Sequence, residues 1–348
     1  MQRFLAVTAL TALVALALGG CGMDKDKGIF MAAGSYGDLA VVVSDDALQP
    51  AANRFLAEFN TSHVFVIKQE PAFKADVYPP QKWDLAKGYK NVLLAVEIGG
   101  GGPVEKAARS IVSKDAWERL TAGGGGLVQV KDPWSTYQLA VVVASRDRNS
   151  LGSLLMRNAE KIRGIYQTSA RERILRRNRY DGLDDRLMTV LWERFGFFLE
   201  IPAAYRQNQV EPDGYPGIEL MQNGPSRGLT VGWEQAADPE AWLADRDVLA
   251  AMRARLGEAM HDEQIVPESF VWSETELGGI PVVKLEGAWT GNRFAGGGPF
   301  WCYFVPDPDR GRIFCVDMLV YAPGMDKMDF FRRMDAIAHT FSTTRPRP

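Results

Sequence analysis

The apolar positions in the first half of the chain fall into short continuous runs. Five of these runs are β-branched or small and too short for helices, so they predict buried strands: 39–43, 64–68, 92–98, 127–131 and 139–143. From Leu48 to Phe59 the apolar residues recur at helical spacing, which predicts a helix with one buried face. Residues 146–179 and 183–195 have helical composition and are separated by Gly182. The proline-rich segment 70–84 predicts a long surface loop.

Beyond residue 195 the pattern becomes alternating and rich in aromatic residues. Seven segments predict strands with turns between them: 197–201, 218–222, 229–234, 270–274, 282–290, 300–305 and 313–321. Residues 239–256 and 325–341 predict helices. This order of strands and helices implies an antiparallel sheet covered by helices on one side.

The predicted fold class is therefore α+β. We expect an N-terminal α/β-type domain over 38–195, with central strands and long connecting helices, and a C-terminal antiparallel α+β domain over 196–348. If the first twenty residues are removed, 348 − 20 = 328 residues remain, and this length suggests about two domains.

The first twenty residues have the layout of a secretory signal. Arg3 is their only charge, residues 4–18 carry none, and small residues follow before a cysteine. The sequence Leu-Gly-Gly-Cys at 18–21 matches a bacterial lipobox. We therefore expect a signal peptide over 1–20 and lipidation of Cys21, with palmitate among the acyl groups. The apolar run is short for a membrane-spanning helix, which needs about 20 residues.

Lipidation of Cys21 would attach the protein to a bacterial membrane. Residues 21–37 are polar and Gly-rich and predict a flexible tether between the lipid and the first domain. We expect a cell-envelope location on the periplasmic or surface face, with the outer membrane favoured.

Composition narrows the classes of partner and cofactor. The chain has 40 Lys and Arg against 43 Asp and Glu, a net charge of −3, which argues against general nucleic-acid binding. None of its three histidines, His63, His261 and His339, lies in a metalloprotease motif, so no metal site and no cofactor are predicted.

Two glycine-containing segments match the letters of known motifs but lack the neighbouring residues or elements that the motifs need. Residues 224–228 fit the G-x-S-x-G nucleophile elbow, but a strand rather than a helix follows Ser226, so a hairpin loop is the expectation. Residues 99–106 resemble a phosphate-binding loop, yet Lys106 has no hydroxyl residue after it. Neither motif predicts a catalytic residue.

Two cysteines remain once Cys21 is assigned to lipid. Cys302 and Cys315 flank a predicted hairpin turn in a protein expected in an oxidising compartment. They could form a cross-strand disulfide or remain two buried thiols, and the sequence leaves both alternatives open.

Two clusters are candidate contact surfaces. A basic run could meet anionic lipid headgroups, or could be a solvated helix face paired with acidic residues: Arg171, Arg173, Arg176 and Arg177. An aromatic and glycine-rich region could form a partner or ligand surface, or could be core: Trp289, Phe294, Gly296, Gly297, Gly298, Trp301 and Tyr303.

Several short motifs carry a family likeness: Gly-Asp-Leu at 37–39, Lys-Asp-Pro-Trp at 131–134, Leu-Glu-Gly-Ala-Trp at 285–289, Gly-Gly-Pro-Phe at 297–300 and Val-Tyr-Ala-Pro at 320–323. With the lipobox, they make nearly the whole mature chain resemble the bacterial lipoprotein family DUF4837. The resemblance implies an envelope lipoprotein and supplies no catalytic residues. The order of elements in the second half faintly resembles the PsbP/Mog1 fold, whose members generally act as binding or assembly modules.

The expected function is that of a membrane-anchored envelope lipoprotein that binds or assembles with an envelope protein partner and has no catalytic activity. Two alternatives stay open. One is an envelope hydrolase whose active site the sequence does not announce, and the other is a lipid- or glycan-binding module that uses the aromatic C-terminal region.

Overall fold

The computed structural model describes residues 23–24, 29–60, 62–63, 69–293 and 295–344. The predicted signal peptide, Cys21, the strand expected at 64–68 and Phe294 lie outside these residues. The chain divides into an N-terminal unit, Met1–Leu56 with Ala75–Ala159, and a C-terminal unit, Ala57–Lys74 with Glu160–Pro348.

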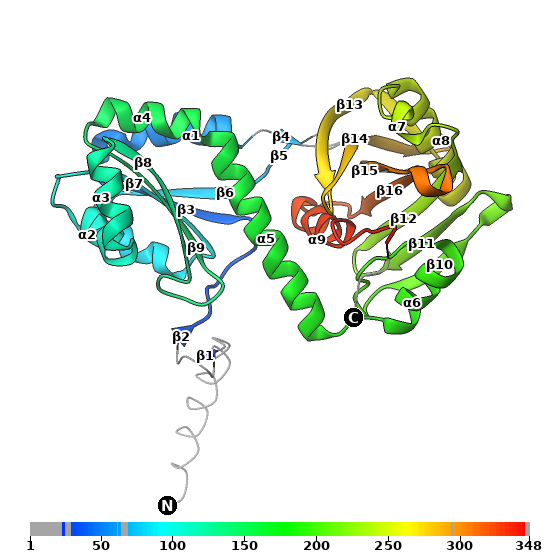
Figure 1. Ribbon diagram of the computed structural model, residues 1–348, viewed down its shortest axis with the longest axis horizontal. Coiled ribbons are helices and arrows are strands. Elements are labelled where there is room, and N and C mark those ends of the chain that lie inside the picture. The colour runs from blue at the N-terminus through cyan, green and yellow to red at the C-terminus, as the bar shows by residue number, and fades with distance from the viewer. Residues whose placement is uncertain (1–22, 25–28, 61, 64–68, 294, 345–348) are drawn as a thin grey trace, which may run out of the picture. The chain divides into compact units, whose positions relative to one another are not determined.

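The N-terminal unit is built on a five-stranded sheet in the order β6-β3-β7-β9-β8 (Figure 1). Its strands are β6 (Lys74–Tyr78), β3 (Asp38–Val43), β7 (Asn91–Glu97), β9 (Leu139–Ser145) and β8 (Gly125–Lys131). Strands β3, β7 and β9 are parallel, with Val41 opposite Leu93 and Leu93 opposite Val141, and β8 pairs antiparallel with β9. These three parallel strands are almost completely buried on both faces, which explains why their sequences are continuous apolar runs.

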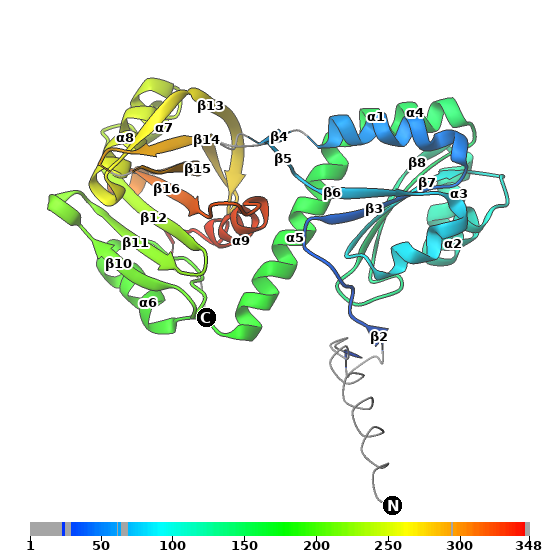
Figure 2. The same ribbon diagram turned by 180° about the vertical axis from the view of Figure 1, so that it is seen from behind.

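Helices cover both faces of this sheet (Figures 1 and 2). Helices α2 (Pro103–Ile111) and α3 (Lys114–Ala122), with the 3₁₀ segment η2 (Pro80–Gly88), enclose the core that contains Val42, Leu94 and Val142. Helices α1 (Gln49–Phe59) and α4 (Arg148–Arg157) cover the other face.

The C-terminal unit is built on a seven-stranded antiparallel sheet in the order β10-β11-β12-β16-β15-β14-β13. The strands are β10 (Arg206–Val210), β11 (Gly217–Gln222), β12 (Ser226–Gln235), β13 (Glu263–Leu277), β14 (Ile280–Gly291), β15 (Gly297–Asp307) and β16 (Arg312–Tyr321). The predicted meander and hairpin are confirmed.

This sheet buries two apolar cores, one on each face. The first contains residues of α6 (Asp185–Val190), of the π-helical segment Leu191–Phe195 and of α9 (Met328–Ala338). The second lies under α7 (Pro239–Trp242) and α8 (Arg246–His261). The expectation of a sheet covered on one side is therefore wrong, because the alternate residues of β15 and β16 are apolar on both faces and both need cover.

The division into units differs from the predicted domain boundary at residue 196. The long helix α5 (Ala159–Asp181) belongs to the C-terminal unit from residue 160 onward. The buried ring of Tyr166 packs edge-on against Phe59 at 6.4 Å between ring centroids and lies 6.0 Å from Phe73, both in the segment Ala57–Lys74. Aromatic packing thus ties this helix to the second unit.

Three local predictions are wrong. Residues 197–201 form no strand beyond one bridge from Phe198 to Ser342, although Phe197, Leu199 and Ile201 are buried as a strand pattern would suggest. The polar strand β10 was not predicted, and the segment 70–84 contains β5 (Glu70–Pro71), β6 and the start of η2 rather than only a loop.

Among the described residues, no helix is both long enough and apolar enough to cross a membrane.

Candidate functional site

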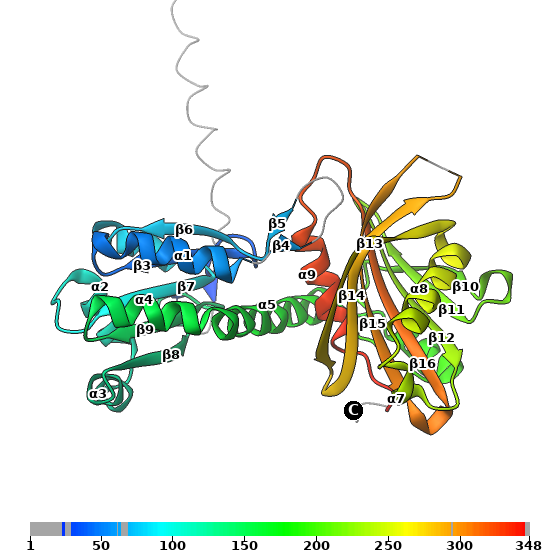
Figure 3. The ribbon, with the colours of Figure 1, turned by 90° about the horizontal axis from the view of Figure 1, so that it is seen from above.

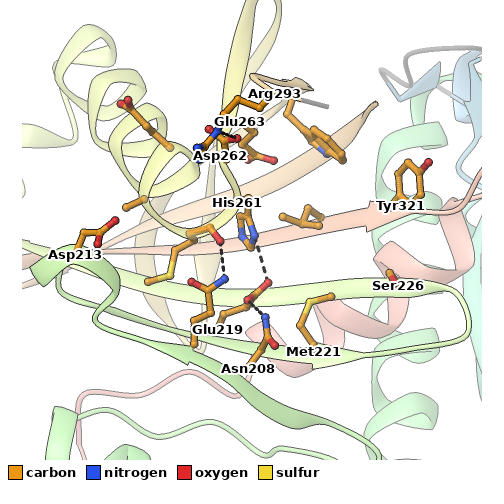
Figure 4. A pocket seen from close by; sticks show the side chains of 16 residues that line it. Asn208, Asp213, Glu219, Met221, Ser226, His261, Asp262, Glu263, Arg293 and Tyr321 are labelled. Atoms are coloured by element: carbon orange, nitrogen blue, oxygen red, sulfur yellow. Dashed lines mark hydrogen bonds and ion pairs between the residues drawn. The ribbon is translucent and has the colours of Figure 1, made fainter. Parts of the chain in front are cut away.

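The C-terminal end of α8 forms one wall of a polar pocket. The helix begins at a capping residue, Asp245, whose carboxylate accepts hydrogen bonds from the amides of Asp247 and Val248. It ends at Asp262, whose left-handed φ of 53° turns the chain into β13. This turn leaves His261 facing the sheet (Figure 4).

The pocket has a volume of about 640 Å³ and is lined by residues of β10, β11, β12, β14, β16 and α8. Its lining combines apolar and polar side chains, among them Asn208, Glu219, Ser226, His261, Trp289 and Tyr321. Tyr321 is 44% exposed, whereas Trp289 is 4% exposed and belongs mainly to the core.

His261 is held from two sides. Its Nδ1 lies 3.2 Å from Glu219 Oε1, and its Nε2 lies 3.3 Å from Thr230 Oγ1. Asn208 donates to the other Glu219 oxygen at 2.5 Å. Burial, with a further contribution from the positive charge of Arg253, lowers the pKa of His261 to about 3. The imidazole is therefore neutral at pH 7, and both of its nitrogens are already engaged.

A second polar cluster lies beneath α8 and fixes its position on the sheet. Arg253 Nε donates to Asp317 Oδ1 at 2.8 Å, and its Nη2 donates to Glu263 Oε1 at 2.5 Å. The three side chains are at most 1% exposed. The guanidinium also lies 4.2 Å from the ring centroid of Phe300, a cation–π contact.

Burial dominates the electrostatics of this second cluster. It raises the pKa of Asp317 to about 7 and raises that of Glu263 above its usual range, although Arg253 acts in the opposite direction on both. Burial also opposes the charge of Arg253, but the two carboxylates outweigh it and raise the arginine pKa. One guanidinium therefore holds two buried carboxyl groups next to the pocket.

Two further lining residues of the pocket, Asp262 and Arg293, form a surface ion pair. Arg293 Nε lies 2.6 Å from Asp262 Oδ2, and Asn292 reaches the other oxygen of the same carboxylate at 3.3 Å. The arrangement offers hydrogen-bonding groups beside the aromatic rings of Trp289 and Tyr321. Such a lining suits the binding of a small polar ligand or a polar side chain of a partner.

The aromatic surface expected in β14 and β15 is wrong for Trp301 and Tyr303, whose side chains are in the core, whereas Trp289 is also mostly buried but lines the pocket. Trp289, Trp301 and Tyr303 are 4%, 5% and 3% exposed. A Cβ added to Gly297 or Gly298 would lie 2.8 Å from a backbone oxygen of the neighbouring strand, so these glycines serve strand packing. Gly296 lies in the turn between β14 and β15 and its carbonyl accepts from the Gly291 amide.

The basic run on α5 is largely paired. Arg171 lies 3.4 Å from Asp335 and Arg177 lies 2.7 Å from Asp181, while Arg173 is buried. Arg176 also has an interaction partner. These contacts favour the alternative of a paired helix face over a headgroup site.

Cys302 and Cys315 are both buried free thiols, the second of the two alternatives. They lie on adjacent strands but not opposite each other, since Cys302 pairs with Asp317 and Cys315 with Phe304. Burial raises the pKa of the Cys315 thiol well above its usual value. Both thiols therefore behave as small core side chains.

The two glycine motifs have structural roles. Ser226 opens β12 directly after a hairpin turn, as expected. At the loop before α2, the Glu105 carboxylate accepts from the Gly99 and Gly101 amides at 3.1 and 2.7 Å, so the chain's own acid already uses two of the donors that a phosphate would need. Among the described residues, no group of three or more His, Cys, Asp or Glu side chains could hold a metal ion.

Sequence reasoning missed most of the pocket. The sequence pattern assigns His261 no metal site, and it does not single out Asn208, Glu219, Arg253 or Asp317. A signal was present, because Glu219 lies between Ile218 and Leu220 and Asp317 between Val316 and Met318. An acid inside an apolar strand indicates a buried partner.

Comparison with known families divides the chain in two. Residues 184–340 match the model of a family described as domain of unknown function (DUF4837). Residues 32–179 match a separate model, domain of unknown function DUF8532. The predicted resemblance to DUF4837 is thus confirmed for the C-terminal part, whereas the motifs at 37–39 and 131–134 belong to the second match. A search of the curated proteins found no match.

Two solved structures are weakly similar to the chain. The solution structure of cyanobacterial PsbP from Synechocystis sp. PCC 6803 has a TM-score of 0.30 and 13% sequence identity, covering 43% of this chain and 88% of that one. LpqN, described as involved in cell envelope biogenesis of Mycobacterium tuberculosis, has a TM-score of 0.27 and 14% identity, covering 42% and 82%. The expected faint likeness to PsbP is confirmed at this level. These scores are too low to say anything about function.

Proposed function

We propose that this chain is a lipid-anchored protein of the bacterial cell envelope that acts as a non-catalytic binding or assembly module, with the polar pocket of its C-terminal unit as the ligand site. The lipobox at 18–21 supports the anchor. Diacylated or triacylated cysteine holds a protein on a membrane far more firmly than a single chain does, so the rest of the chain is free to contact partners.

The contacts and the lowered pKa of His261 support a binding role for the pocket rather than a catalytic one. A general base needs a ring nitrogen free to accept a proton near pH 7. Here Glu219 and Thr230 occupy both ring nitrogens, and burial with Arg253 lowers the pKa of His261 to about 3. The imidazole therefore serves better as a fixed part of the pocket wall, which holds Glu219 and Thr230 in place, than as a base, while the cavity of about 640 Å³ leaves room for a ligand group.

Site-specific photo-crosslinking in the producing bacterium tests this role. A photoreactive phenylalanine analogue would replace Tyr321, which lines the pocket and is 44% exposed. The matched control would replace Tyr180 on α5, which is 83% exposed and does not line the pocket.

We expect a discrete adduct from position 321 and none from position 180. A further His261→Leu substitution in the position 321 variant should weaken the adduct, because it removes the ring that holds Glu219 and Thr230 in place and so changes the pocket wall. Equal adducts at both positions, or no adduct at position 321, would contradict a binding role for the pocket.

A further inference from the structure

The N-terminal unit has a groove between two helices that the proposed function does not use. Helices α1 and α4 run side by side over one face of the sheet (Figure 3). A Cβ added to Gly152 would lie 3.4 Å from the Cβ of Ala51, so small residues let the helices approach closely. A cavity of about 690 Å³ lies along them.

The charged residues that line this groove all have the same sign. They are Arg54, Arg148 and Arg157, and no acidic side chain is among the lining residues. The positive charge of Arg148 is compensated by two carboxylates outside the groove, those of Asp45 at 2.7 Å and Glu97 at 3.2 Å. The groove therefore retains a net positive charge from its other two arginines.

Arg54 on α1 and Arg157 on α4 both line the groove, so each helix contributes one of these two cations. Both are exposed, and neither forms an ion pair with any residue that the structure describes. A guanidinium presents a planar fork of donors that matches the oxygens of a phosphate group in two parallel hydrogen bonds. Asn149 and Ser153 add polar groups to the lining of the groove.

Part of the groove lining is apolar. It contains Leu48, Pro50 and Met156, and Met156 is 38% exposed. An inorganic anion would leave this surface in contact with water, whereas the carbon part of an ester would cover it. The lining thus suits an anion that carries an apolar or glycerol-like portion.

One end of the groove lies near the carboxyl ends of two parallel strands. Leu48 follows the carboxyl end of β3, and Arg148 follows the carboxyl end of β9. Strand β6 lies on one side of β3 and β7 on the other, so the chain order reverses direction at β3. In sheets of this type, ligands bind outside the carboxyl ends of the strands near such a reversal.

We propose that the groove between α1 and α4 binds a phosphate ester, with Arg54 and Arg157 binding the phosphate. The ester would come either from the headgroup of an anionic phospholipid or from a soluble metabolite. This site is independent of the C-terminal pocket and of Cys21, so its failure would leave the proposed function untouched.

Binding titrations of the full-length protein in neutral detergent test the proposal. The probes are sn-glycerol 3-phosphate and dihexanoyl phosphatidylglycerol. Both contain a glycerol phosphate ester, and the lipid adds two acyl chains and a second glycerol on the same phosphate. The test variant is Arg54→Gln/Arg157→Gln. The control, Arg119→Gln/Arg186→Gln, removes the same charge from two other exposed arginines outside the groove, and so shares any unspecific attraction or partition into detergent.

We expect the wild type and the control to bind alike, and the groove variant to bind at least about tenfold more weakly, as the loss of charge-assisted hydrogen bonds implies. If the groove variant binds only the lipid more weakly than the control does, a lipid headgroup is the source of the ester. If it binds glycerol phosphate more weakly, a soluble ester is the source. Arg54→Lys/Arg157→Lys keeps the charge without the fork and should bind at an intermediate strength. Equal binding by the two glutamine variants, or binding of neither probe by the wild type, would overturn the proposal.

Discussion

The buried arginine beneath α8 allows a quantitative test of how the pocket is held together. Arg253→Met keeps most of the side-chain length and removes the charge. Because Arg253 is 0% exposed and its partners Glu263 and Asp317 are 1% exposed, water cannot replace the guanidinium. Breaking a buried ion pair from one side costs about 3–5 kcal/mol, so we expect the free energy of unfolding of the C-terminal unit to fall by that amount.

Arg255→Met is the matched control on the same helix. Arg255 also holds a carboxylate, with two bonds to Glu234 at 2.9 and 2.7 Å, but it is 49% exposed. Exposed pairs contribute about 1 kcal/mol or less. Hydrogen exchange of the β16 amides under increasing denaturant reads the stability of this unit alone. A loss for Arg253→Met no larger than for Arg255→Met would refute the reasoning.

Three further predictions concern the same region. Gly257→Ala should destabilise the unit by about 1–3 kcal/mol, because the added Cβ would lie 2.3 Å from Arg253 Nη1, whereas Gly164→Ala, with open space around its Cβ, should not. Burial raises the pKa of Asp317 from 3.8 to about 7, so the stability of wild type relative to Asp317→Asn should fall as pH rises from about 4 to about 7. Because the pKa of His261 falls from 6.5 to about 3, the stability of wild type relative to His261→Gln should instead rise between about pH 3 and 6.5. Thermal or denaturant melts of each variant at several pH values check all three, and an opposite sign in either pH series would count against the assigned burial.

The sequence predicts best those strands whose hydrophobic pattern follows from their own burial or from an adjacent turn. Strands β3, β7 and β9 are continuous apolar runs because both of their faces are covered, and the hairpin of β11 and β12 follows from its turn residues. Residues 197–201 have the apolar alternation of a strand but find no strand partner, since their cover is the C-terminal core. Pairing is a tertiary property, so the pattern alone could not exclude this segment.

The pocket could not be assembled from sequence because its parts are distant along the chain. Asn208, Glu219 and His261 come from three elements and meet only through sheet order and the turn at Asp262. The aromatic residues of β14 and β15 misled for a related reason. Aromatic composition is the same for a ligand cleft and for a core, and only the cover by helices on both faces shows that these rings are buried.

Mass spectrometry of the N-terminal peptide, from protein purified out of the bacterial envelope, tests most directly the central claim that this protein is lipid-anchored. We predict that the mature chain begins at Cys21, lacks residues 1–20 and carries a diacylglyceryl group. Cys21→Ser should prevent both cleavage and acylation while leaving the fold of the two units unchanged. A mature chain that begins elsewhere, or an unmodified Cys21, would contradict the lipid anchor.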